Sequence, residues 1–151
     1  MEVSVARHRC ALSTIDFPYF FDRAHLEVAG DIRALAVNQL SNEEDHIAVE
    51  GPIGLEAERL RCRVLAKKLA DVGLFRYCVP ARVGGTQVSA PDAVDVRMLC
   101  LIREALGWAS GVADVVFAMQ GLGSYPIVLA GTDEQRAEFL ADLARGEDGH
   151  A

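Results

Sequence analysis

The chain has 151 residues, of which 51% are hydrophobic and 25% charged, and a formal net charge of −7. This length suits one globular domain, and the apolar content is high enough to offset the entropy of folding, which excludes a disordered chain. Its basic residues are scattered along the sequence, so a nucleic-acid partner is excluded, because phosphate binding requires clustered lysine and arginine.

A first helix is expected after an N-terminal stretch that shows no clear period. Asp16, Phe17 and Pro18 are predicted to open it, because proline is tolerated where its missing N–H would be unpaired anyway, and the helix should reach about Leu40. His25 is expected on its surface. The predicted inward stripe consists of Phe20, Phe21, Leu26, Ala29, Ile32, Leu35 and Ala36.

A second helix is predicted over residues 55–72, where the amphipathic pattern is clearest. Its acids lie early and its bases late, which suits the helix dipole. Residues 41–54 are expected to form a polar loop before it. Gly73 is expected to end the helix in a left-handed conformation, and residues 74–80 to continue as an extended apolar segment.

Two strongly apolar helices are expected to set the core. The capping-box spacing of Ser89 and Asp92 predicts the start of the first, which should end near Trp108. Ser110 is predicted to cap the second, over residues 112–121.

A break is expected after this pair of helices. Gly121, Gly123 and Pro126 are predicted to interrupt the apolar run, because glycine and proline weaken a helix interior. A short helix over residues 126–129 is expected to follow and to end at Gly131.

A last helix is predicted from the capping box of Thr132 and Gln135 to a stop at Gly146. Its inward residues should be Phe139, Leu140 and Leu143. No segment alternates with the period of a surface strand. The expected fold class is therefore all-α, a single helical-bundle domain of about five or six helices.

Several kinds of chemistry find no support in the sequence. The four cysteines form no CxxC pair and have no histidine at ligand spacing, so they are expected to be buried thiols and no metal site is predicted. No GxSxG or HExxH motif is present, and no catalytic residue is assigned. No apolar run is expected to reach the roughly 18 residues that cross a bilayer, so no membrane contact and a cytoplasmic location are predicted.

Three segments, taken in order, resemble the N-terminal helical domain of acyl-CoA dehydrogenases. They read GLFRYCVPARVGG over residues 73–85, VRMLCLIREALGWASGVADVVFAMQGLGSYPI over 96–127 and GTDEQRAEFLADLARGE over 131–147. The family often has an aromatic residue where this chain has Val83. No single motif is specific, but their order and spacing match together over nearly the whole chain.

The resemblance implies a division into three parts. Residues 1–15 are expected to be a flexible N-terminal segment, 16–147 the acyl-CoA dehydrogenase-like helical domain, and 148–151 a polar tail. Enzymes of this family add a middle β-domain and a C-terminal helical domain, which hold FAD and the carboxylate base that removes the α-proton. The chain is therefore expected to be a truncated flavoprotein of fatty acid metabolism, inactive alone and without bound FAD.

The residues carried over from the family form one wall of the acyl-chain pocket. They are Asp114, Val115, Ala118 and Leu122. Small or aliphatic side chains about one helical turn apart suit an apolar slot, and Ala118 leaves room in it. A stripe with this spacing usually belongs to a protein core, and the helix dipole equally explains Asp114. Cofactor-binding residues are not assigned.

The resemblance also implies partners. In the complete enzyme these are the acyl-CoA substrate and the missing middle and C-terminal domains or a partner subunit. An isolated domain should expose apolar surface, which predicts self-association. Two alternatives are a non-catalytic helical partner of a separately encoded dehydrogenase half and an unrelated helical interaction module.

Overall fold

The computed structural model describes residues 10, 12–40, 54–86, 88 and 90–146. Over these ranges the fold is all-α, as predicted, with five continuous helices and no strand. The helices are α1 (Arg23–Leu35) extended by the π-helical turn η2 (Ala36–Leu40), α2 (Leu55–Asp71), α3 (Val96–Ala109), α4 (Gly111–Ala130), and a last helix made of α5 (Asp133–Gln135), η5 (Arg136–Leu140) and α6 (Ala141–Arg145). The 3-10 turn η1 (Pro18–Phe20) precedes α1, and the 3-10 turns η3 (Leu74–Cys78) and η4 (Ala81–Val83) lie between α2 and α3.

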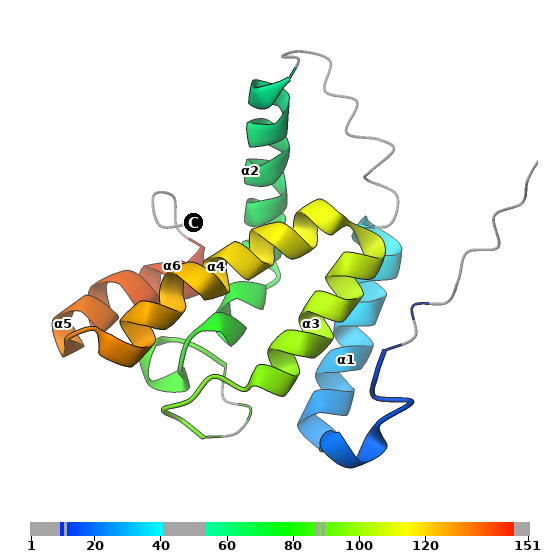
Figure 1. Ribbon diagram of the computed structural model, residues 1–151, viewed down its shortest axis with the longest axis horizontal. Coiled ribbons are helices and arrows are strands. Elements are labelled where there is room, and N and C mark those ends of the chain that lie inside the picture. Colours follow the sequence, from blue (N-terminus) through cyan, green and yellow to red (C-terminus); the bar gives the residue numbers. More distant parts are fainter. Residues whose placement is uncertain (1–9, 11, 41–53, 87, 89, 147–151) are drawn as a thin grey trace, which may run out of the picture.

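Helix α4 organises the packing. It contacts α3, α2, η3 and η5, while α1 lies beside α3 (Figure 1). The rings of Phe75 in η3 and Phe117 in α4 stack with their centroids 6.5 Å apart at the centre of the core. The first turns of α2 project beyond the other helices in Figure 1, so this end of the molecule has fewer neighbours.

The first helix begins later than predicted. Pro18 starts only the 3-10 turn η1, and Asp22 caps α1 by accepting a hydrogen bond from the His25 amide. Phe20 and Leu26 of the predicted stripe are at least half exposed, whereas His25 is fully buried, so its expected place on the surface is wrong. The aspartate cap sets the rotation of the helix, and this rotation turns position 25 inward.

The predicted extended segment after α2 is also wrong. Gly73 is left-handed, with φ of 75°, and stops α2 as expected, but the chain then winds into η3. Phe75 and Cys78 are buried three residues apart while Arg76 remains exposed, which is the spacing of a 3-10 turn. An apolar run of this length does not distinguish a strand from a short helix by its pattern alone.

Helix α3 starts at Val96, capped by Asp95, whose carboxylate accepts the backbone N–H groups of Arg97 and Met98. The predicted start near the capping-box spacing of Ser89 and Asp92 is therefore wrong, and Ser89 itself lies outside the described residues. The predicted end near residue 108 agrees with the structure, where α3 ends at Ala109.

Helix α4 runs unbroken from Gly111 to Ala130, so the predicted interruption and the separate short helix are wrong. Ser124 is fully buried, and its hydroxyl donates to the carbonyl of Gly121 at 3.2 Å or of Cys78 at 3.4 Å. Packing against η3 thus holds a helix that local propensity disfavours. Among the described helices, α4 is long and apolar enough to cross a membrane on length and composition, a test that core helices also pass.

The caps predicted for the last two helices are confirmed. Ser110 accepts a hydrogen bond from the Ala113 amide at 3.2 Å, and Thr132 with Gln135 forms the reciprocal capping box. Gly146 ends the last helix with φ of 67°.

The N-terminal side of the packed body reaches Cys10. Cys10 and Leu12 are buried, and Ser13 bonds through its amide and hydroxyl to the carboxylate of Glu104 at 2.9 and 2.7 Å. The division of the chain at residue 16 remains a prediction.

Candidate functional site

The orientation of α4 is fixed at its N-terminal end. Ser110 both follows the last residue of α3 and caps α4, so only one residue separates the two helices. Arg103 of α3 bonds bidentately to the carboxylate of Asp114, with both N···O distances 2.8 Å. Hydrogen bonding to Asp114 also raises the pKa of the Arg103 guanidinium, which favours the charged form of Arg103.

The two long sides of α4 differ in exposure although both are apolar. The inner side is buried and carries Ala113, Val116, Phe117 and Ser124. The outer side, which we call the outer stripe, is 45–68% exposed and carries Val115, Met119, Leu122, Tyr125 and Leu129. These positions follow one another at helical spacings of three or four residues, which places them along one side of the helix.

The predicted pocket-wall residues fall into two groups. Val115 and Leu122 belong to the outer stripe, being 57% and 68% exposed, and the half-buried Ala118 lies at its edge between them. Asp114 does not face the same way, because its carboxylate is bound to Arg103 of α3 and is only 18% exposed. The structure therefore brings three of the four together and assigns Asp114 to the joint between helices.

Sequence reasoning missed three members of the outer stripe: Met119, Tyr125 and Leu129. The signal was present, because the helical spacing continues from Leu122 to Tyr125 one turn later and to Leu129 two turns later. The expected break at residues 121–126 ended the helix too early for Tyr125 and Leu129 to be included. Met119 lies inside the predicted helix, one turn after Val115, and was overlooked.

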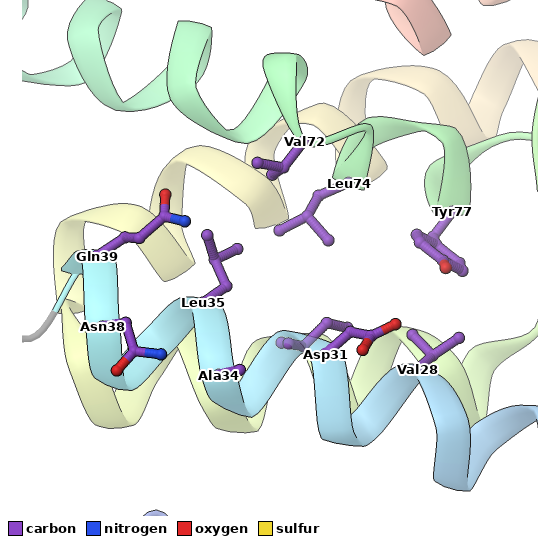
Figure 2. Close-up of a pocket in the computed structure, with 10 residues that line it drawn as sticks. Val28, Asp31, Ala34, Leu35, Asn38, Gln39, Val72, Leu74 and Tyr77 are labelled. Atoms are coloured by element: carbon purple, nitrogen blue, oxygen red, sulfur yellow. The ribbon is translucent and has the colours of Figure 1, made fainter.

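Two grooves lie elsewhere on the domain. The first has a volume of about 380 Å³ between α1 with η2 on one side and the corner of α2 and η3 on the other (Figure 2). Val28, Leu35 and Leu74 give it apolar walls, and Asp31 and Tyr77 are among its polar groups. Burial raises the pKa of the Tyr77 hydroxyl, and the nearby Asp31 carboxylate adds to this effect.

The second groove, of about 410 Å³, lies between the end of α2 and α6 and includes Arg76 and Arg145 in its lining. No residue of the outer stripe lines either groove. The outer stripe is thus an open apolar wall, and a closed acyl-binding slot requires a second surface opposite it.

The cysteines differ in exposure. Cys10 and Cys78 are buried and Cys62 is half-buried, but Cys100 is exposed, so the expectation that all four thiols are buried is wrong for Cys100. Burial raises the pKa of the Cys78 thiol to about 12, which keeps it protonated and unreactive.

Comparison with known proteins settles the family. The family described as acyl-CoA dehydrogenase, N-terminal domain, matches residues 23–147. This chain belongs to the acyl-CoA dehydrogenase family. The match confirms the resemblance drawn from the sequence and removes the alternative of an unrelated helical module.

Individual relatives match a shorter part. A 3-(aryl)acrylate reductase of Clostridium sporogenes (strain ATCC 15579) is 34% identical over 84 residues, covering 55% of this chain and 21% of that protein. A probable acyl-CoA dehydrogenase of Bacillus subtilis (strain 168) is 35% identical over 83 residues, covering 55% of this chain and 13% of that protein. The chain thus aligns with about a fifth or less of each relative's length.

Proposed function

We propose that this domain supplies one wall of the acyl-chain pocket in an FAD-dependent enzyme that dehydrogenates acyl-CoA thioesters between the α and β carbons. The observation that carries the proposal is the outer stripe, an exposed apolar side of a fixed helix in a domain of this family. An alkyl chain gains free energy when such a surface removes it from water, at about 0.8 kcal/mol per buried CH₂.

The residues of the stripe have distinct parts in this proposal. Val115 and Leu122 contact the acyl chain, and the small side chain of Ala118 leaves the space between them open. Asp114 acts indirectly, because its bond to Arg103 sets the rotation of α4 and hence the direction of the stripe.

The reacting groups belong to other parts of the complete enzyme. The family resemblance implies a carboxylate base that takes the α-proton and FAD that accepts the hydride from the β-carbon. The stripe presents aliphatic and thioether side chains with the Tyr125 hydroxyl, which suits an alkyl tail and not the polar edge of a flavin. We therefore propose that the domain alone neither binds FAD nor oxidises a substrate.

A direct test is to purify the chain, add FAD and measure flavin absorbance after gel filtration, together with acyl-CoA oxidation by a dye acceptor. A colourless and inactive sample is expected. Because one relative is named a 3-(aryl)acrylate reductase, an arylacrylate with a chemical reductant is included as a second substrate. Turnover of either substrate by the chain alone would contradict the proposal.

The pocket role is tested in a chimera in which residues 23–147, the part that matches the family, replace the N-terminal helical domain of a complete acyl-CoA dehydrogenase. Ala118→Leu should fill the slot and shift kcat/KM toward shorter acyl chains, because the added carbons occupy space that a longer chain requires. Ala137→Leu, at an exposed position of η5, is the matched control and should leave the chain-length profile unchanged. An equal profile in both variants would remove Ala118 from the pocket wall.

A further inference from the structure

The turn before α1 carries a group of exposed aromatic side chains. Tyr19 is fully exposed, and Phe17, Phe20 and the nearby Ile15 are each exposed by more than half. The rings of Phe17 and Phe20 meet edge to face, with their centroids 6.4 Å apart. We call these four residues the aromatic patch. Four large apolar side chains gathered on one short turn are typical of a contact surface, because removing them from water is favourable.

The backbone that carries the aromatic patch is fixed at both ends. Ser13 bonds through its amide and hydroxyl to the carboxylate of Glu104 in α3, and its carbonyl accepts the Phe17 amide at 2.8 Å. At the other end, Arg97 of α3 donates to the Phe20 carbonyl at 2.9 Å. A surface that is already ordered loses less conformational entropy when a partner binds, so the turn is well suited to hold one.

The aromatic patch and the outer stripe lie at opposite ends of α3. Arg97, which holds the patch, belongs to the first turn of α3, whereas α4 begins after the last residue of that helix. In Figure 1 the blue turn before α1 lies at the lower ends of α1 and α3, and α4 leaves from the upper end of α3. A helix of 14 residues is about 20 Å long. The acyl wall proposed for the outer stripe therefore does not account for the exposed rings.

The basic residues beside the aromatic patch already have acidic partners. Arg23 lies 2.7 Å from Glu27, and Arg97 lies 3.6 Å from Asp22. The rim thus offers no excess of positive charge for the phosphates of a membrane surface. It does offer both signs, so a two-fold axis can place an acid of one copy of the chain against a base of another.

The size of the aromatic patch suits a second copy of the chain. An aromatic side chain buries roughly 150–250 Å². Three rings and one aliphatic side chain, all more than half exposed, therefore supply over half of the roughly 800 Å² that each partner gives to a standard interface. Around a two-fold axis the same surface of each copy meets itself, so an apolar centre faces an apolar centre.

We propose that the aromatic patch is a two-fold contact between two copies of this chain, with Tyr19 at its centre. Tyr19 is the most exposed of the four side chains, so it reaches furthest toward a partner. Phe17 and Phe20 present an edge and a face to the rings of the second copy, which are the arrangements that aromatic pairs prefer. A two-fold contact closes on itself, so it forms dimers and not longer assemblies.

The first experiment measures assembly by sedimentation of the full chain with Leu122→Glu. This substitution weakens association through the outer stripe, so the association that remains reports the aromatic patch, and a dimer is expected. Adding Tyr19→Glu should raise the dissociation constant of the dimer at least tenfold, because each copy then brings a negative charge into the same contact. Adding Ala137→Glu instead, at an exposed position of η5, should leave it unchanged.

Two outcomes of this experiment would overturn the proposal. One is a chain that is already monomeric with Leu122→Glu alone, and the other is an equal effect of Tyr19→Glu and Ala137→Glu. Because the side chain of Tyr19 is fully exposed, its substitution should not disturb the fold, and circular dichroism checks this.

The second experiment locates the axis by cross-linking. In the Leu122→Glu chain with Cys100→Ser, Tyr19→Cys should form an intermolecular disulfide under a mild oxidant, because the two copies of residue 19 meet near the axis. Ala137→Cys in the same background is the matched control and should cross-link at least tenfold more slowly. Equal rates at the two positions would overturn the proposed contact.

Flotation with vesicles of neutral phosphatidylcholine separates a second copy from a membrane surface. The Leu122→Glu chain should remain a dimer and should not float with the vesicles. A monomer that floats with them, and that loses this binding in Tyr19→Glu, would overturn the proposal and assign the aromatic patch to a membrane surface.

Discussion

The inner and outer sides of α4 are made of similar residue types and have opposite surroundings. Val116 and Phe117 on the inner side are buried, whereas the neighbouring Val115 and, further along, Leu122 are more than half exposed. Hydrophobicity alone does not separate these sides, because the helix is apolar around most of its circumference. The core is defined by which side the other elements approach.

Small side chains lie on the inner side where η3 comes close. Ser124 is fully buried there, and a Cβ added to Gly121 would already be in van der Waals contact with the Cys78 sulfur, 3.8 Å away. The outer stripe instead carries large aliphatic and aromatic side chains with no such neighbour. Close packing therefore limits the size of the residues on the inner side beside η3, whereas the residues of the outer stripe share only their apolar character.

The largest contrast is expected between Phe117→Ala and Leu122→Ala. Removing the Phe117 ring leaves a cavity against Phe75 and should cost about 3–5 kcal/mol of unfolding free energy. Leu122→Ala, on the exposed side, should change it by no more than about 0.5 kcal/mol. Urea unfolding followed by circular dichroism measures the free energy of unfolding of both variants. Equal losses of stability would contradict the claim that only the inner side of α4 is packed in the core.

The next effect concerns association. A leucine moved from water to a contact contributes roughly 1.5–3 kcal/mol, so Leu122→Glu should weaken self-association of the isolated chain by at least tenfold. Light scattering and binding of a hydrophobic dye measure the change, with Ala137→Glu at an exposed position of η5 as the control for one added negative charge. If the unsubstituted chain is monomeric and binds no dye, the prediction that the outer stripe causes self-association is wrong.

A gain in stability is expected at the proline of the same helix. Pro126 is exposed and cannot donate an N–H to the carbonyl one turn earlier, so Pro126→Ala should stabilise the chain by about 1–2 kcal/mol. Pro18→Ala, at the first position of η1 where proline costs little, should give no gain. A loss of stability in Pro126→Ala would mean that the outer side of α4 requires the proline for its shape.

The smallest effect is chemical. Burial raises the pKa of Cys78 to about 12, so its thiolate is scarce at pH 8, and a thiol reagent should modify the exposed Cys100 long before Cys78. Mass spectrometry after short labelling measures the order. Faster labelling of Cys78 in Phe117→Ala should follow, because the inner side of α4 then opens more often.

The family, the all-α class and the helix caps with local chemistry could be predicted from the sequence. Ser110, Thr132 and Gly146 act within one turn of their own helix, so their residue types and spacing carry the signal. Asp22 and Asp95 also cap within one turn, but they were missed because Pro18 and the Ser89–Asp92 spacing offered competing start signals a few residues earlier. The burial of His25 between these two caps is indicated by no local pattern.

The candidate site was predicted in part for the same reason. Val115, Ala118 and Leu122 could be grouped because helical spacing alone places them on one side. The spacing also reaches Leu129, but the sequence does not show that the helix continues that far, since this depends on Ser124 bonding to η3 across 46 positions in the chain. Nor could the pairing of Asp114 with Arg103, which requires the angle between two helices.

The single residue between α3 and α4 has a consequence for how this domain tolerates change. Each residue turns an α-helix by about 100°, so one residue inserted between Ser110 and Val115 would rotate the rest of α4 by more than a quarter turn. Val116, Gln120 and Gly123 would then take the places of Phe117, Gly121 and Ser124 beside η3, and Phe117 would move to the half-buried position that Ala118 now holds. Substitutions in the outer stripe can therefore change the shape of the apolar surface without disturbing the core. The number of residues between Ser110 and Val115 cannot change, because it sets which side of α4 faces the core.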